Sequence, residues 1–350
     1  MLWLEGLREL PGLGLIFVAA LTMLLPLSRQ AALSVFLMGA GYALYAFVGS
    51  YSALLVAVIA ASFGFHMWTP INNAIGFSLS SKENAGRVLG TLSSVGSLAS
   101  ITGMGAISLI SLLFESMPLG NYYLVGGIFI CLASLLLLRL PTAIGATDAK
   151  PSRILIRKRY WLYYVLVFLS GARKLVLGSL VTLMLVQDFG ITRRPDEAVK
   201  LLSSVLTMLL APSLGALIDR IGERITTPIA YSILAACCLG FAFIPSLGVL
   251  MALWVLAKLV GPLGMGLHTY VYRTAPAEEL APTLTAGVTF DHISSVSVPF
   301  LVGAVLPIVD YRGVFVAGAL LILVSIPFSR IMQVQAAVPA PSVKASQPAD

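Results

Sequence analysis

Residues 123–138 read YLVGGIFICLASLLLL, a run without a charged residue. A second run of the same kind, residues 13–27, reads LGLIFVAALTMLLPL. Both runs are apolar on every side, whereas a strand of a membrane β-barrel would alternate polar and apolar side chains. Such runs predict α-helices that cross a lipid bilayer, which need about 20 apolar residues each.

The composition of the whole chain supports this interpretation. Of the 350 residues, 58% are hydrophobic and only 11% are charged, and the mean hydropathy is +0.96. Soluble proteins carry about 25% charged residues, because their surfaces must be hydrated. The composition therefore excludes a soluble enzyme, a nucleic-acid-binding protein and a disordered scaffold. A chain of this length has room for roughly ten to twelve spans.

Charged and Pro/Gly-rich breaks divide the chain into eleven predicted spans. They cover residues 11–28, 31–49, 52–79, 86–113, 120–140, 160–188, 196–217, 226–245, 247–272, 282–307 and 312–331. The predicted fold class is an all-α polytopic membrane protein built from two helical bundles. The predicted parts are an N-terminal bundle of about five helices (1–140), a cytoplasmic central loop (141–159), a C-terminal bundle of six helices (160–332) and a disordered tail (333–350).

The net charge of +7 is explained by where the basic residues lie. On the side of the predicted central loop there are fourteen, against five on the opposite side. This asymmetry satisfies the positive-inside rule and predicts a cytoplasmic C-terminus with Met1 outside. The charge is thus an orientation signal, and we expect no nucleic-acid partner. Residues 1–10 contain no secretory signal, and the three cysteines lack the spacing of a disulfide or metal site.

Residues 215–224, between two predicted spans, read GALIDRIGER. This segment resembles the G-x-L-x-D-R-x-G-R-R loop of the major facilitator superfamily, with Glu223 where a basic residue is usual. The resemblance implies a cytoplasmic gating loop whose charge pairs latch one conformation. Its predicted residues are Gly215, Asp219, Arg220, Gly222 and Arg224. A solvated turn that obeys the positive-inside rule is the alternative.

Two longer segments resemble the same family. Residues 64–103 are similar to its fourth helix, basic loop and fifth helix, and residues 160–190 to a seventh helix carrying the F-x-S-G-A-R motif of an uncharacterised bacterial branch. Residues 87–103 and 285–303 also share Gly and Ser-Ser-Val spacing, as the family's two pseudo-symmetric halves would. The resemblance makes the first span here the family's second helix, so the family's first helix is expected to be absent.

Ionisable residues inside the spans mark the predicted site. Arg173, Lys174, Lys258 and Asp291 fall there, and a charge near the bilayer centre costs at least ~2.5–3.5 kcal/mol. Arg173 lies roughly 20 Å and Lys258 roughly 16 Å along their helices. The resemblance places them on cavity-lining helices, so we expect both to bind an anionic group, with Asp291 paired to one of them. An ion pair that only fixes helix packing is the alternative.

Other polar residues at similar depth complete the predicted site. A histidine changes charge near neutral pH, so we predict proton coupling by Asp291, His66 and His292. We expect Asn72 and Tyr270 to contact the substrate. Polar side chains of this kind also serve as contacts between packed helices.

Together these features predict a secondary active transporter of a small anionic organic solute, working by alternating access and coupled to a proton or another ion. We expect a monomer in a bacterial inner membrane, without a cofactor. A non-transporting scaffold of the same fold, or a lipid- or cofactor-binding protein, is the alternative. An enzyme and an ATP-driven pump are disfavoured, because the sequence contains no nucleophile elbow, Walker sequence or metal-ligand spacing.

Overall fold

The computed structural model describes residues 9–114, 116–147, 154–191 and 193–333, which are helices joined by short turns. Within these ranges, nine helices are long and apolar enough to cross a membrane. The predicted tail lies outside the described residues from position 334 onward. The division of the chain at 140 and 160 stays a prediction.

The first half contains a short initial helix and five helices after it. Residues 9–13 are helical and lead, after a turn at Gly14, into the next helix. The segments are α2 (Leu15–Thr22), α3 (Leu27–Leu44), α4 (Tyr51–Ser78), α5 (Ala85–Leu113) and α6 (Leu119–Leu137). Helix α4 begins where the Ser50 hydroxyl accepts a hydrogen bond from the Ala53 N–H at 3.2 Å, a standard N-cap. Helix α3 packs between α4 and α6.

The second half contains longer and more interrupted segments. They are α7 (Trp161–Leu175) with a π-helical turn (Val176–Leu180) and α8 (Val181–Phe189), α9 (Arg193–Ile221), α10 (Glu223–Phe243), α11 (Leu247–Val260) with a 3₁₀ turn (Gly261–Met265) and α12 (Gly266–Thr274), and α13 (Ala277–Arg330). Helix α13 has two arms, because Asp310 leaves the helical conformation at φ 55°. The Asp310 carboxylate accepts a hydrogen bond from the Gly313 N–H at 3.1 Å and so caps the second arm.

These segments confirm the predicted fold class. The two arms of α13 count separately, and residues 9–22, which comprise the short initial helix and α2, join the nine long helices as one segment, which gives eleven in the described part of the chain. Each corresponds to one predicted span. The pattern was readable because every span is bounded by charged, proline or glycine residues that interrupt a continuous apolar run.

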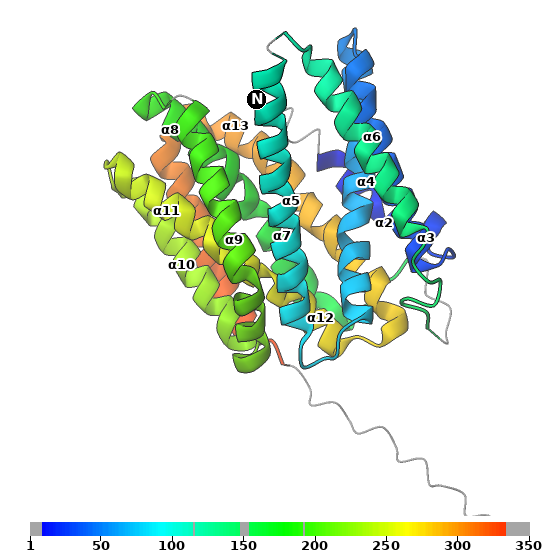
Figure 1. The fold of residues 1–350 in the computed structure, drawn as a ribbon. Coiled ribbons are helices and arrows are strands. Elements are labelled where there is room, and N and C mark those ends of the chain that lie inside the picture. The colour runs from blue at the N-terminus through cyan, green and yellow to red at the C-terminus, as the bar shows by residue number, and fades with distance from the viewer. Residues whose placement is uncertain (1–8, 115, 148–153, 192, 334–350) are drawn as a thin grey trace, which may run out of the picture.

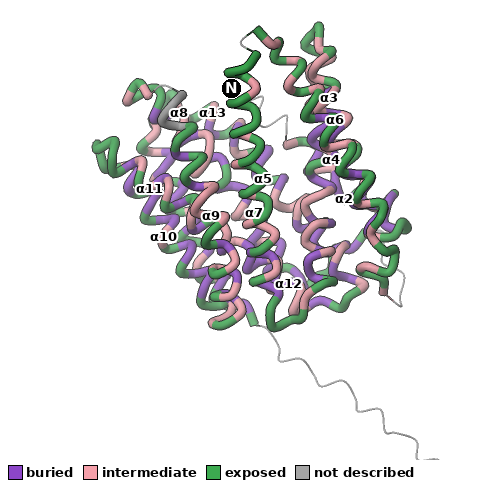
Figure 2. Tube along the Cα trace, viewed as in Figure 1, coloured by how far each residue is buried: buried purple, intermediate pink, exposed green. Residues whose placement is uncertain are grey.

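Burial differs between the two halves. The most apolar stretch of α10 is 67% buried, whereas the corresponding stretches of α5 and α6 are 0% and 11% buried. Figure 2 shows this difference as exposed surface along much of α5 and α6. Exposed apolar helices are stable in lipid, where no hydration cost applies. The main hydrophobic core therefore lies in the second half.

The two halves meet most closely where α5 runs beside α9 (Figure 1). A β-carbon at Gly86 would overlap the carbonyl oxygen of Gly215, and one at Gly215 would overlap the carbonyl oxygen of Gly86. Further along α5, a β-carbon at Gly96 or Gly103 would meet no atom within 4 Å. The glycines thus bring the halves together at the predicted cytoplasmic end.

Candidate functional site

A cavity of about 580 Å³ lies between the two halves. Its walls come from the first described turn and α4 and α5 in the first half, and from α7, the 3₁₀ turn before α12, α12 and α13 in the second. The predicted site residues that line it are His66, Asn72, Arg173, Asp291 and His292. A second cavity of about 270 Å³ is lined by Arg173, Lys174, Tyr231 and Lys258. We call these the central cavity and the side cavity.

Arg173 lies at the junction of the two cavities. Its side chain is only 9% exposed, and its guanidinium carbon lies 4.4 Å from the centre of the Tyr231 ring, a cation–π contact. Its Nη1 atom is buried and has no hydrogen-bond partner among the described residues. Buried charges are normally paired. Arg173 therefore has a buried hydrogen-bond donor without a described partner, on a side chain that lines both cavities.

Asp291 pairs with Lys174, which corrects the predicted pairing with Arg173 or Lys258. The Lys174 ammonium donates a hydrogen bond to the Asp291 carboxylate. Neighbouring helical residues point about 100° apart, so when Arg173 faces Tyr231 of α10, Lys174 faces α13. The helix rotation that decides between the two cations was not readable from the sequence.

The F-x-S-G-A-R motif explains why α7 and α13 approach closely. A β-carbon at Gly171 would overlap the carbonyl oxygen of Asp291 and the hydroxyl of Ser294. Ser294 in turn donates a hydrogen bond to the Phe168 carbonyl. The missing side chain at Gly171 thus lets the two helices touch, and this places Lys174 beside Asp291.

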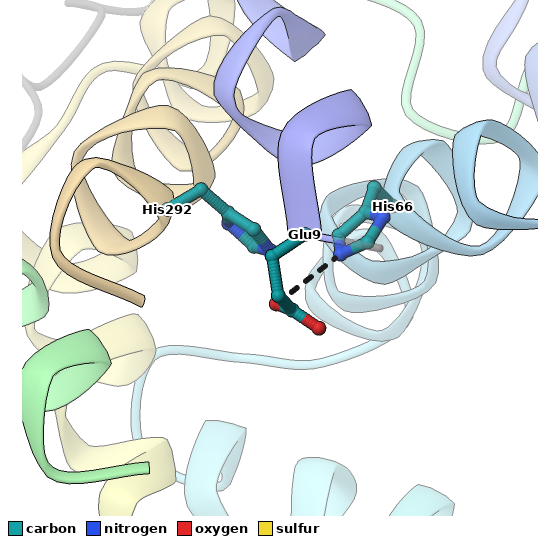
Figure 3. A group of neighbouring side chains, drawn as sticks. All are labelled: Glu9, His66 and His292. Carbon is teal, nitrogen blue, oxygen red and sulfur yellow. Dashed lines mark ion pairs between the residues drawn. The ribbon is translucent and has the colours of Figure 1, made fainter. Parts of the chain in front are cut away.

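Glu9, His66 and His292 form a cluster at one side of the central cavity (Figure 3). The Glu9 carboxylate lies 3.1 Å from His292 Nε2 and 3.8 Å from His66 Nε2. The two imidazole rings meet edge to face, with centres 4.4 Å apart. Both histidines are at most 5% exposed. Glu9 was missed because the first span was predicted to begin at residue 11, which left Glu9 outside it and made Asp291 the only buried acid.

Two of the residues that were predicted to contact the substrate do not line the central cavity. Lys258 is exposed and reaches the side cavity but not the central one. Tyr270 is half-buried and packs against the hydrophobic core, and it lines neither cavity. The third histidine of the chain, His268, lines the central cavity instead.

The predicted gating loop closes one end of the molecule through Asp219. Its two carboxylate oxygens accept hydrogen bonds from the N–H groups of Gly86 and Arg87, each at 2.8 Å. The first N–H groups of α5 have no acceptor within the helix and lie at its positive end. The side chain of the N-cap residue Asn84 does not accept a hydrogen bond from them. An acid from the second half thus caps a helix of the first.

Arg273 of α12 is the basic partner of Asp219, a residue that the sequence analysis did not single out. Its guanidinium lies 2.7 Å from Asp219 and 2.8 Å from Glu223, and its Nε donates to the Lys82 carbonyl at 2.9 Å. The expected partners Arg220 and Arg224 are exposed instead. Asp219 turns inward from the last turn of α9, and both of these arginines point to solvent.

Glu223 explains the departure from the family motif. It is 1% exposed, accepts a hydrogen bond from the Thr269 hydroxyl at 2.6 Å and shares Arg273 with Asp219. A basic residue at this position would face Arg273 across a buried space. Gly222, with φ 82°, provides the sharp turn that places Glu223 at the start of α10.

Further contacts close the same end. The Tyr272 hydroxyl donates to the Ser80 carbonyl at 2.9 Å, and its ring stacks on Phe77 with centres 4.4 Å apart. The Lys82 ammonium donates to the Arg273 carbonyl at 3.3 Å. Each contact joins the first half to α12. We call this set, centred on Asp219 and Arg273, the latch.

A family model described as Major Facilitator Superfamily matches residues 10–257 and, in a second match, residues 162–349. No curated protein sequence matches the chain.

Solved structures share the arrangement of the helices. A crystal structure of the human organic anion transporter MFSD10 (TETRAN) aligns with a TM-score of 0.74 at 15% identity, over 94% of this chain and 83% of that chain. FucP, a transporter solved in the outward conformation, gives 0.73 at 17% identity, over 94% and 89%. A second structure, of the E. coli fucose:proton symporter FucP, gives 0.68 at 17%, over 95% and 96%. At these identities the likeness concerns the fold.

Proposed function

The chain belongs to the Major Facilitator Superfamily, and on this premise we propose that it is a secondary transporter of a small organic anion. The observation that carries the proposal is Arg173, a buried guanidinium between two cavities with a donor atom that no described residue satisfies. Burying an unpaired charge costs several kcal/mol. A bound carboxylate or other oxyanion would offset that cost and accept the free hydrogen bond.

The charges around Arg173 support an anionic ligand. Lys174 and Lys258 also line the side cavity, and no acidic residue does. The Asp291 carboxylate neutralises Lys174 from the central cavity. The side cavity therefore presents excess positive charge, which attracts an oxyanion. The central cavity adds Asn72 and other neutral polar groups that suit the body of an organic solute.

Alternating access is supported by the position of the latch. The hydrogen bonds that join the halves at Gly86, Lys82 and Ser80 lie at the predicted cytoplasmic end. Further along α5, β-carbons at Gly96, Gly103 and Gly105 would meet no atom within 4 Å, so the backbone contact made by Gly86 and Gly215 is not repeated at these glycines. This arrangement fits a state in which the cavity is closed on the cytoplasmic side, and opening requires the latch to break.

We also propose that transport of the solute is coupled to a proton or another cation. Asp291 and Lys174 form an ion pair on the cavity wall, with His292 and His66 nearby. A proton or another cation that reached this group would compete for the carboxylate and release Lys174 to the substrate. We propose a monomer in a bacterial inner membrane, with the C-terminus on the cytoplasmic side, which is the orientation that the charge asymmetry predicts.

Two of the similar structures support this function by analogy. One is an organic anion transporter and another a fucose:proton symporter. The anionic substrate of the first agrees with the charge of the side cavity here. The proton coupling of the second agrees with ionisable groups in the central cavity.

The test is uptake into proteoliposomes that contain the purified chain. A panel of radiolabelled small carboxylates and sugar acids is offered with and without an inward proton gradient. We expect at least one acid to accumulate, and Arg173→Ala to abolish its uptake. Arg330→Ala is the matched control, since Arg330 is exposed in the last turn of α13. If no solute accumulates under any gradient, the transporter proposal fails and the scaffold alternative gains.

A further inference from the structure

The cluster of Glu9, His66 and His292 has the donor set of a metal site. Two imidazole nitrogens and a carboxylate oxygen lie within 4.8 Å of one another. Two histidines and one carboxylate are a recurrent set for divalent transition metals. Figure 3 shows the three side chains converging from separate segments of the chain.

The hydrogen bonds behind the two imidazoles fix which nitrogen faces the cluster. His66 Nδ1 lies 2.7 Å from the Ser62 carbonyl oxygen, and His292 Nδ1 lies 2.6 Å from the Val288 carbonyl oxygen. A carbonyl oxygen only accepts, so each Nδ1 carries the hydrogen and donates it. In the neutral ring the Nε2 atom then has a free lone pair. Metal-binding histidines are oriented in the same way by a second hydrogen bond.

His292 Nε2 gives an independent indication of a ligand. The atom is buried and has no hydrogen-bond partner in the described structure, and the His292 residue is 3% exposed. It points at the Glu9 carboxylate, 3.1 Å away. A buried acceptor without a donor is costly. A cation between the nitrogen and the carboxylate would satisfy the nitrogen and attract the carboxylate.

The separations suit a small divalent ion. Bonds of about 2.0–2.1 Å in a tetrahedral site place neighbouring donor atoms about 3.3 Å apart. The Glu9 oxygen is 3.1 Å from His292 Nε2 and 3.8 Å from His66 Nε2, both within about half an ångström of that value, and all three donor atoms lie within 4.8 Å of one another. The nearby Asp291 carboxylate, 3.5 Å from His292 Nδ1, adds negative charge that its partner Lys174 offsets.

We propose that Glu9, His66 and His292 bind a divalent transition-metal ion such as Zn²⁺, which clamps the two halves of the protein together. Glu9 and His66 belong to the first half, and His292 belongs to α13 of the second. Bound metal therefore holds these elements at their present separation. The binding claim stands on the cluster geometry, whereas the clamp claim rests on the proposed transport cycle.

The binding claim is tested with Co²⁺, whose visible absorption reports its ligands. The full chain is purified without a polyhistidine tag, freed of metal with a chelator and titrated. We expect one equivalent to bind. His66→Ala and His292→Ala should each weaken binding by more than about 100-fold, since outer-shell partners alone are worth about 10- to 100-fold. His268→Ala, which removes the chain's other histidine, should bind as the wild type does.

Three results would overturn the site. They are the absence of stoichiometric binding by the wild type, a loss of binding in His268→Ala equal to that in His292→Ala, and a near-ultraviolet thiolate band that survives in both cluster variants. Melting temperatures keep the variants interpretable. Metal should raise the melting temperature of the wild type and of His268→Ala, and it should leave that of folded His292→Ala unchanged.

The clamp claim is tested by uptake in the presence of Zn²⁺. We expect inhibition of the wild type at the concentration that saturates binding, and an inhibition constant at least about tenfold higher for Glu9→Gln, which removes the one ligand of the cluster that is not assigned to coupling. Metal binding without inhibition would overturn the clamp and leave the site intact. Uptake that requires the metal would also overturn the clamp, whereas absence of uptake both with and without metal would instead count against the proposed function.

Discussion

The carboxylate of Asp219 accepts a hydrogen bond from the backbone N–H of Gly86 at 2.8 Å, so the end of α9 in the second half caps the start of α5 in the first. Arg273 lies on the other side of the same carboxylate, 2.7 Å away. One acid thus satisfies a helix end and a cation from different segments. Because both groups are nearly buried, the energy of the latch depends on Asp219 keeping its charge.

We expect Asp219→Asn to open the protein at the end that carries the latch. The amide keeps the size of the side chain but loses the ion pair with Arg273, and hydrogen bonds to charged groups contribute about 1.5–3 kcal/mol. The measurement is the distance between spin labels at the exposed positions Glu83 and Arg224, with the three native cysteines replaced by alanine. We expect the variant to show a population of molecules with a longer distance between the labels. An unchanged distance distribution would contradict the role of the latch.

Gly86→Ala is predicted to impair closure of the latch. Its β-carbon would overlap the Gly215 carbonyl and lie 2.8 Å from the Asp219 carboxylate oxygen. The helices must then separate, so the melting temperature and the fraction of closed molecules should both fall. Gly96→Ala on the same helix is the matched control. A β-carbon there meets nothing, and alanine stabilises a helix interior by roughly 0.5–1 kcal/mol relative to glycine. Equal effects of the two changes would contradict the close-contact account.

Glu223→Arg is predicted to be strongly destabilising, although a basic residue is usual at this place in the family motif. The side chain is 1% exposed and faces Arg273 at 2.8 Å, so the change sets two cations against each other. Breaking a buried pair costs about 3–5 kcal/mol. Thermal unfolding in detergent measures this loss. Arg224→Glu, at the adjacent exposed position, should change the melting temperature little, and a large drop there would show that the charge of the loop matters instead.

Gly171→Val is predicted to separate Lys174 from Asp291. The added side chain would enter the contact between α7 and α13 beside the Asp291 carbonyl. Overpacking of this kind costs about 1–3 kcal/mol. Uptake should fall while the protein still folds, as judged by its elution volume. The control is Gly178→Val in the adjacent π-helical turn, where a β-carbon meets no atom within 4 Å. Full uptake activity of the Gly171→Val protein would contradict this explanation of the motif.

The positions of the helices could be predicted from the sequence, because each apolar run and its boundary are local features. The depth of Arg173, Asp291, His66 and His292 followed from the same count of residues, and all four line the central cavity. The pairing partners did not follow, because they depend on helix rotation and packing. Asp291 meets Lys174 and not Arg173, and Asp219 meets Arg273, which lies 54 residues further along the chain.

The central claim is that Arg173 binds the anionic group of the transported solute. The most direct measurement is the affinity of the purified protein for an acid that the wild type accumulates, compared between Arg173→Ala, Arg173→Lys and the exposed-site control Arg330→Ala. We predict that Arg173→Ala weakens binding by at least about 10-fold, since a hydrogen bond to a charged group contributes about 1.5–3 kcal/mol. Arg173→Lys should bind more tightly than Arg173→Ala and less tightly than the wild type. Arg330→Ala should bind as the wild type does. Equal affinity of the wild type and Arg173→Ala for that acid would contradict the claim.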